Sequence, residues 1–279
     1  MKHRRITRKR NLLAVGAMSA LALGALSVAP SAGAAGASLP ETTSQPSVLG
    51  VPGVRTEDTH EWAGYVATGG GKPFTYVAAE FTVAAVNCGV TPHLSWTSQW
   101  VGLDGWHGKT VEQVGVKSEC GGDRDLPPNA AHYYAWWEMY PDPVRVLEPV
   151  NAGDTVEAQV YEISPGEYAL SLQDVTKGGG EAGEVEFCHA CKNASAEVIS
   201  EGYNEDDWKG PADFGRESFS DISLGEYTDL IGNFSSTIWT NIAAIQDQEN
   251  SHGDLVVDAD PTPLSAGGTA FSVVWHSDK

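Results

Sequence analysis

Short runs of alternating polar and apolar residues, separated by glycine, proline, asparagine or aspartate, fill this chain from about residue 57 onward. The clearest runs are 74–83, 155–163, 168–175, 196–200 and 271–275, in which Val, Thr, Tyr, Phe and Trp predominate. Because successive side chains of a strand point to opposite faces, alternation with a period of two predicts β-strands. Only the stretch 236–245 is ambiguous between helix and strand. We therefore expect an all-β fold, an antiparallel β-sandwich of two packed sheets.

The region before these runs has a different composition. Residues 2–10 are basic, residues 11–29 are apolar, and residues 32–34 (Ala-Gly-Ala) are small. This order predicts a secretory signal peptide over residues 1–34, with a transmembrane helix as the alternative. Residues 35–56 are rich in Ala, Gly, Ser, Thr and Pro and are expected to be a linker or short propeptide, followed by one domain over residues 57–279. The mature protein should be secreted, extracellular and free of the membrane.

Charge excludes several classes of partner. Lys and Arg number 17 against 37 Asp and Glu, a net charge of −20. Six of the bases lie in residues 1–34, so the remainder carries 11 bases and a net charge of −26. Because nucleic acids are bound by basic surfaces, we expect no nucleic-acid partner. We expect a monomer that acts on protein or peptide substrates.

Four cysteines follow the signal peptide, and they allow three disulfide pairings. We favour Cys88–Cys120 and Cys188–Cys191, which close loops locally. Zinc is the alternative, because residues 188–191 have CxxC spacing, but Cys88 and Cys120 are 32 residues apart and offer no second such pair. Export to an oxidising compartment favours disulfides, so no metal is expected.

Four of the runs divide into two distinct faces when alternate residues are separated. Along 134–140, Trp136, Glu138 and Tyr140 share one face. Similar outward rows combine aromatic, carboxylate and amide groups: Trp96, Ser98, Trp100, Gly102 and Asp104; Val111, Gln113 and Gly115; and Glu197, Ile199 and Glu201. Such rows are unusual on a merely solvated sheet and are suited to binding an extended chain.

In their order along the chain, several motifs resemble those of the eqolisins, the glutamic peptidases. They are Trp-Ala-Gly-Tyr-Val at 62–66, Trp-Val-Gly-Leu-Asp at 100–104, Val-Glu-Gln-Val-Gly-Val at 111–116, Tyr-Ala-Trp-Trp-Glu-Met-Tyr-Pro at 134–141, Ser-Ala-Glu-Val-Ile-Ser-Glu at 195–201 and Ala-Asp-Phe-Gly at 212–215. The chain is similar to a bacterial-type secreted member of that family. The resemblance implies a concanavalin A-like lectin/glucanase type of sandwich and an acid-acting endopeptidase without a cofactor.

The resemblance also implies a catalytic pair, which falls on Gln113 and Glu201. The family's substrate-groove positions fall on the following residues: Trp62, Trp100, Asp104, Trp136, Glu138 and Tyr140. Three positions depart from the family pattern: Glu61 stands before Trp62, Lys117 follows Gly115 by two residues, and Val198 replaces an aromatic residue.

A Gln/Glu pair can hydrolyse a peptide bond by activating water. The carboxylate of Glu201 would take a proton from the water and return it to the leaving amine, while the amide of Gln113 would donate to the oxyanion. One alternative is a glycoside hydrolase on a lectin-like sandwich that uses Glu138 and Glu201 as paired carboxylates. Another is a non-catalytic carbohydrate- or peptide-binding module. A glycosidase has no need of Gln113, which separates it from the peptidase hypothesis.

Overall fold

We describe a computed structural model of the chain, in which residues 53–91, 93–121, 127, 129–179, 182–203, 210–226, 230–249 and 253–276 are placed. All of them belong to one compact unit, residues 44–279. The predicted signal peptide and most of the predicted linker lie outside the described residues. Among the described residues, no helix has the length and apolar character that a membrane span requires.

The described part of the chain is built from β-strands, as the alternating pattern predicts. Their bounds in chain order are β1 Val54–Thr59, β2 Trp62–Thr68, β3 Phe74–Thr82, β4 Trp96–Leu103, β5 Val111–Cys120, β6 Ala131–Tyr140, β7 Arg145–Pro149, β8 Thr155–Ser164, β9 Glu167–Asp174, β10 Ala182–Phe187, β11 Ser195–Glu201, β12 Arg216–Glu226, β13 Leu230–Gly232, β14 Thr240–Glu249, β15 Leu255–Pro261 and β16 Phe271–Trp275. The ambiguous stretch 236–245 becomes the start of β14.

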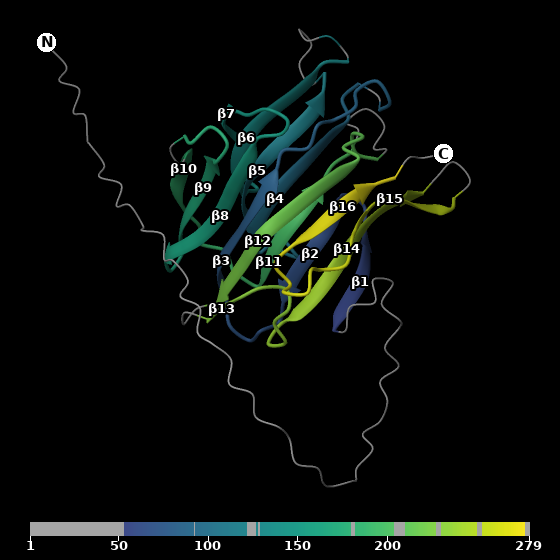
Figure 1. The fold of residues 1–279 in the computed structure, drawn as a ribbon. Coiled ribbons are helices and arrows are strands. Elements are labelled where there is room, and N and C mark those ends of the chain that lie inside the picture. Colours follow the sequence, from purple (N-terminus) through teal and green to yellow (C-terminus); the bar gives the residue numbers. More distant parts are fainter. Residues whose placement is uncertain are drawn as a thin grey trace, which may run out of the picture. The chain divides into compact units, whose positions relative to one another are not determined.

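The strands form one hydrogen-bonded sheet that folds back on itself. Its order is β10-β9-β8-β3-β12-β16-β15-β14-β2-β11-β4-β5-β6-β7. The first half packs against the second, because β3 contacts β4 and β11, β8 contacts β4 and β5, and β9 contacts β5 and β6. Figure 1 shows β8, β3, β12 and β16 side by side in one of these layers. Strands β14 and β15 join the two layers.

One strand pair departs from the expected antiparallel arrangement. Strand β1 pairs in parallel with β14, from Val54 opposite Asn241 to Thr59 opposite Gln246. The first part of this edge of β14 is open to β1 because β15 pairs only with the later part of β14, from Gln246 to Glu249. Residues 54–56 of the expected linker therefore belong to the sheet.

The space between the layers is filled by aromatic and branched side chains. Phe271 stacks on Phe219 at 5.0 Å between ring centroids and meets Tyr65 edge-on at 4.8 Å. All three are nearly or fully buried. The Tyr65 hydroxyl donates to the carbonyl of Thr262 at 2.9 Å, so this buried hydroxyl has a hydrogen-bond partner.

Both favoured disulfides are confirmed. Cys88–Cys120 joins the segment after β3 to the end of β5, and Cys188–Cys191 closes the loop between β10 and β11. The structure describes no free cysteine.

Candidate active site

Five neighbouring strands of one layer carry the predicted site residues. They are β2, β11, β4, β5 and β6, in that order across the sheet. Their alternate residues face either the core between the layers or the outer surface, where a second apolar cluster forms from Val66, Trp100, Trp136, Ile199 and Ile242. Val101, Val114, Ala135 and Val198 belong to the main core instead. The division of faces derived from alternation is therefore correct on β4, β6 and β11.

Trp100 is the floor of this outer face. Its ring extends over Gly102, where an added Cβ would come within 2.8 Å of the indole. Gly115 lies opposite both Trp100 and Trp136 in the sheet register, and a Cβ there would come within 2.5 Å of Trp100 Cβ. Glycines at 102 and 115 thus make room for the Trp100 side chain, and Gly115 of β5 lies between Trp100 of β4 and Trp136 of β6.

Trp100 and Trp136, which the resemblance assigns to substrate contact, are both buried in this face. Trp100 is 0% exposed and Trp136 is buried, because Trp62 packs edge-on against Trp100 with ring centroids 5.0 Å apart. The indole N–H of Trp136 donates to Ser98 Oγ at 3.0 Å. These two indoles lie beneath the exposed side chains of the outer face. Alternation predicts which face a side chain occupies, but it does not predict how deeply the side chain is buried.

The amide of Gln113 is held by Glu138. The two residues are directly opposite on β5 and β6, and Gln113 Nε2 donates to Glu138 Oε2 at 2.6 Å. The carbonyl oxygen Oε1 of Gln113 is buried and has no hydrogen-bond partner in the described part of the chain. Burial raises the pKa of Glu138, and the hydrogen bond from Gln113 offsets part of that rise. A buried amide oxygen without a partner is uncommon and marks a place where a water molecule can donate.

Glu201 ends β11, opposite Trp62 on β2 and Ser98 on β4. The backbone fixes this end of the strand, because Gly202 N donates to Glu61 O at 3.1 Å and Gln246 Nε2 donates to Gly202 O at 2.6 Å. The half-buried carboxyl has its pKa raised to about 8, first by burial and then by the negative charge of Glu61. The Trp100 and Trp62 indoles lower it in part, and the charge of Glu138 raises it further.

Gln113 and Glu201 face the same side of the sheet with β4 between them. Gln113 is opposite Gly102 of β4, and Glu201 is opposite Ser98. Ideal strand geometry separates their Cα atoms by roughly 10 Å across the strands and about 13 Å along them. Trp100 lies midway between Gly102 and Ser98, so the two polar groups flank its indole, and Glu138 interacts with both.

Asp104 does not belong to this group. It is 3% exposed, and its carboxylate accepts hydrogen bonds from Thr110 Oγ1 at 3.0 Å, Lys192 N at 2.6 Å and Ala194 N at 3.0 Å. These bonds join the end of β4 to the segment that leads into β11, so the carboxylate of Asp104, a predicted substrate-contact residue, is occupied by that segment. Tyr140, in contrast, is 50% exposed at the end of β6.

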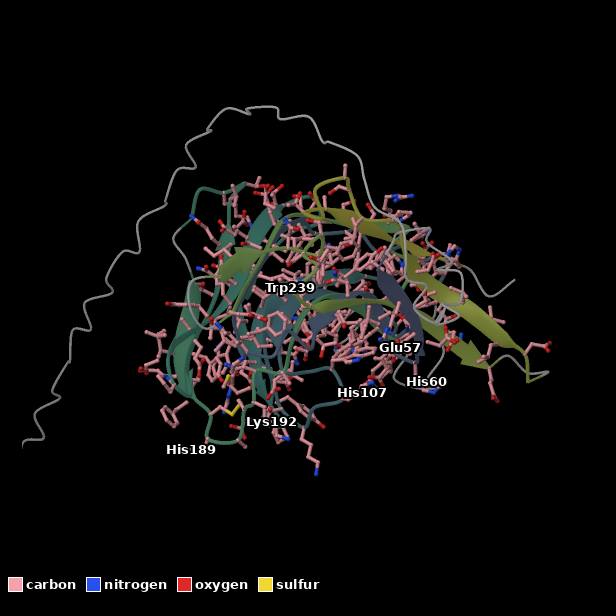
Figure 2. The ribbon with its side chains drawn as sticks, turned by 90° about the horizontal axis from the view of Figure 1, so that it is seen from below. Glu57, His60, His107, His189, Lys192 and Trp239 are labelled. Atoms are coloured by element: carbon pink, nitrogen blue, oxygen red, sulfur yellow. A yellow bond between two sulfur atoms is a disulfide. The ribbon has the colours of Figure 1, made fainter. Side chains whose placement is uncertain are left out.

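The sequence analysis missed Trp106. Its ring lies 6.2 Å from that of Trp62, and its backbone N–H donates to Ser195 Oγ at 3.2 Å and to Glu197 Oε1 at 3.1 Å. Trp106 is part-exposed, so it extends the aromatic surface of Trp62. It follows the end of β4, where alternation no longer applies, and its aromatic character beside His107 was the only signal. Figure 2 places His107 near Glu57 at the same rim, and the His107 Nε2 to Glu57 Oε2 distance is 3.8 Å.

The three departures from the family pattern have different surroundings. Val198 is fully buried in the main core and cannot touch a substrate. Lys117 is opposite Ser98 of β4, at the level of Glu201 on the same face, and its Nζ lies 4.6 Å from the centroid of Trp96 and 3.3 Å from Glu119. Glu61 is the departure whose charge raises the pKa of Glu201.

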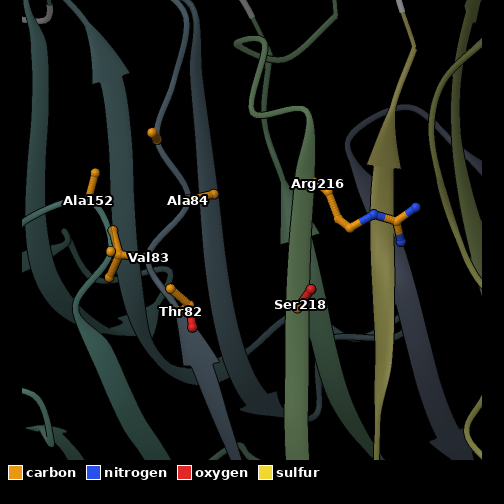
Figure 3. Close-up of a pocket in the computed structure, with 8 residues that line it drawn as sticks. Thr82, Val83, Ala84, Ala152, Arg216 and Ser218 are labelled. Carbon is orange, nitrogen blue, oxygen red and sulfur yellow. The ribbon is translucent and has the colours of Figure 1, made fainter.

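Two other features of the molecule lie apart from this group. A pocket lined by Thr82, Val83, Ala84, Ala85, Ala152, Gly153, Arg216 and Ser218 offers small side chains and one cation but no carboxyl or amide (Figure 3). Among the described residues, the grouping with metal-binding atom types is Glu112 with Cys188 and Cys191, whose sulfurs are bonded to each other.

We compared the sequence with protein families and with curated proteins. The sequence profile of the Peptidase A4 family matches residues 60–260. The chain belongs to the Peptidase A4 family. This is the family of the glutamic peptidases, or eqolisins, so the prediction of a glutamic endopeptidase is confirmed. A search of curated proteins finds no match.

Solved structures of the Peptidase A4 type share the fold. Scytalido-glutamic peptidase with a peptide-based transition-state analogue has a TM-score of 0.58 and 20% identity, over 78% of this chain and 98% of that chain. The eqolisin SCP-B in complex with the tripeptide Ala-Ile-His has a TM-score of 0.56 and 20% identity over the same shares. Aspergilloglutamic peptidase from Aspergillus niger has a TM-score of 0.50 and 21% identity, over 65% of this chain and 99% of that chain.

Proposed function

We propose that this Peptidase A4 chain hydrolyses peptide bonds with Gln113 and Glu201 as its catalytic pair. The observation that carries the proposal is the state of the Gln113 amide, whose nitrogen is anchored on Glu138 while its buried oxygen has no partner. An amide nitrogen has two N–H groups, so one remains after Glu138 is bound. Glu138 thereby acts as the positioning residue that presents the amide.

The chemistry follows from these groups. A water held by Gln113 Oε1 would attack the peptide carbonyl above the Trp100 floor, and Glu201, which flanks the same indole, would take its proton through one further water. The free N–H of Gln113 would donate to the oxyanion, and Glu201 would return the proton to the leaving amine. Trp62, Trp106 and Tyr140 would contact the side chains of an extended peptide, since they line the open part of the same face.

The pKa of Glu201 sets the pH dependence of this mechanism. Glu201 acts as a general base only when its carboxyl is ionised. With a pKa raised to about 8, only a small fraction of Glu201 is ionised in strong acid. We therefore expect activity to rise with pH through the ionisation of Glu201. This moves the optimum toward neutrality from the acid range that the family resemblance implies, and Glu61 contributes to that shift.

We further propose the finer features that the resemblance implies: a concanavalin A-like type of sandwich, secretion after removal of residues 1–34, and a monomer that acts on proteins or peptides. Membership of a peptidase family favours this function over the glycoside hydrolase with paired Glu138 and Glu201, and over a binding module.

Digestion of casein between pH 3 and pH 8 tests the proposed function. Peptide release should persist in EDTA and after treatment with serine-directed reagents, because neither metal nor serine takes part. It should be lost in Gln113→Ala and Glu201→Gln. Full activity in either variant would overturn the pair, and release of reducing sugar from glucans in place of peptides would support the glycosidase.

A further inference from the structure

The Cys188–Cys191 disulfide lies in an accessible loop. Both sulfur-bearing residues are partly exposed, and His189 and Ala190 between them are exposed. Figure 2 shows His189, between the two cysteines, and Lys192, just after them, at the periphery of the molecule. The backbone N–H of Cys191 lies 3.1 Å from Cys188 Sγ, so the fold already supplies one donor to that sulfur. An N–H in this position stabilises a thiolate when the disulfide opens.

A buried carboxyl touches the other sulfur. Glu112 Oε1 lies 2.6 Å from Cys191 Sγ, and Glu112 is 0% exposed. A sulfur in a disulfide carries no hydrogen, so this contact is a hydrogen bond only when the Glu112 carboxyl is protonated and donates. Its second oxygen, Oε2, is buried without a hydrogen-bond partner.

The surroundings keep that proton on Glu112. Burial raises its pKa to about 9, and the negative charges of Asp104, Glu197 and Glu162 raise it further. The groups come from the end of β4, from β11 and from β8, and Tyr168 of β9 also interacts with Glu112. At neutral pH the carboxyl is thus an acid held against a sulfur atom.

We propose that Cys188-His189-Ala190-Cys191 is a redox-active site that exchanges with dithiols, and that Glu112 is the proton donor to Cys191. The substrate class is a small dithiol or a protein with two neighbouring thiols. This activity is separate from peptide hydrolysis and does not depend on the Gln113–Glu201 pair.

The thiol–disulfide exchange proceeds in two steps. A thiolate of the dithiol attacks Cys188 Sγ, the Cys188–Cys191 bond breaks, and the Cys191 sulfur leaves with the proton of Glu112. The second thiol of the dithiol loses its proton to the Glu112 carboxylate and attacks the mixed disulfide. Cys188 then leaves as a thiolate beside the Cys191 N–H. The protein disulfide gains two electrons, and the dithiol is oxidised to a disulfide.

The buried Cys88–Cys120 disulfide is an internal control for unfolding. Cys88 and Cys120 are both buried, at 7% and 0% exposure, so a thiol reaches them only when the fold opens. Selective reaction at residues 188 and 191 therefore reports the local site and not unfolding.

Reduction of the folded protein by dithiothreitol at pH 7, followed by acid quenching, alkylation and peptide mass spectrometry, tests the proposal. We expect Cys188 and Cys191 to be alkylated while Cys88 and Cys120 stay bonded. Glu112→Gln should slow the reaction by about tenfold, because an amide of the same size cannot deliver a proton. Glu162→Gln, which leaves the carboxyl against the sulfur, should react at nearly the wild-type rate.

Equal rates at the two disulfides would overturn the proposal, as would a wild-type rate in Glu112→Gln. If Glu112→Gln does not fold, the wild-type pH dependence decides. The rate divided by the thiolate concentration should fall as Glu112 ionises near pH 9, and a flat profile from pH 7 to pH 10 would contradict the role of Glu112.

Discussion

Glu201 of β11 lies on the outer face of one layer and Glu217 of β12 lies between the two layers, and their difference separates a catalytic group from a structural one. Both have a raised pKa, about 8 for Glu201 and about 7 for Glu217, and burial is the main cause in each. Glu217 is 1% exposed between the layers and accepts from Thr97 Oγ1 at 3.0 Å. Glu201 is half-buried on the outer face and interacts with Glu138, which holds the Gln113 amide.

The comparison teaches that a raised pKa does not by itself identify a catalytic carboxyl. Desolvation acts equally on a group that substrate can reach and on one that it cannot. Glu201 is partly exposed on the outer face that also carries the Gln113 amide, whereas Glu217 is enclosed between the layers. The predictions below address that contrast.

The largest effect should come from Gln113→Ala. We expect kcat to fall by about 10²–10³-fold, since the oxyanion donor and the water acceptor are both removed. The melting temperature should change little, because the amide makes one described hydrogen bond. Steady-state kinetics on a peptide substrate measure the loss. A fall in kcat of less than threefold would remove Gln113 from the mechanism.

The buried carboxyls predict that stability falls as pH rises. Folded pKa values of about 9 for Glu112, about 8 for Glu197 and about 7 for Glu217 all lie above the ordinary value of 4.5. When the pKa of a carboxyl is higher in the folded than in the unfolded state, the free energy of unfolding is highest below about pH 4.5. It decreases as pH rises toward the pKa of the folded state. Between pH 5 and pH 9 we expect the melting temperature to fall by roughly 10 °C or more.

Glu217→Gln should flatten that decline, since it keeps an oxygen acceptor for Thr97 and removes the ionisation. Thermal unfolding followed by circular dichroism provides the measurement. A melting temperature that rises from pH 5 to pH 9 would contradict these assignments.

Trp106 and Trp100 should respond differently to truncation. Trp106→Ala removes part of the open aromatic surface, so KM should rise by about tenfold with kcat and melting temperature nearly unchanged. Trp100→Ala removes a fully buried indole and should destabilise the fold by about 3–5 kcal/mol. An unchanged KM in Trp106→Ala would show that the peptide does not extend over this residue.

The smallest expected effect concerns Glu61. Glu61→Asn removes a negative charge that raises the pKa of Glu201, so that pKa should fall by roughly half a unit to one unit. The rising limb of the kcat/KM pH profile should move to lower pH by the same amount. Lys72→Asn, an exposed change outside the five site strands, is the control. An unmoved limb would mean that Glu201 does not govern it.

The sequence predicted the all-β fold, the strands with clear alternation, the two disulfides and the faces of β4, β6 and β11, because alternation and local loop closure are properties of short segments. It did not predict the parallel pairing of β1, which depends on how much of β14 is left open by β15. It assigned Trp100, Trp136 and Asp104 to the substrate groove without predicting how deeply they lie or what they contact. The space for the Trp100 indole depends on Gly115 of the neighbouring β5 as well as on Gly102, and the Asp104 carboxylate is occupied by donors some 90 residues away in sequence.

The value of kcat/KM for peptide hydrolysis in Glu201→Gln, measured beside Glu217→Gln, tests the central claim most directly. Both variants replace a carboxyl of raised pKa with an amide of the same size. We predict a loss of about 10²-fold or more in Glu201→Gln and activity within about twofold of wild type in Glu217→Gln. Retained activity in Glu201→Gln, or an equal loss in both variants, would contradict the assignment of Glu201 as the catalytic base.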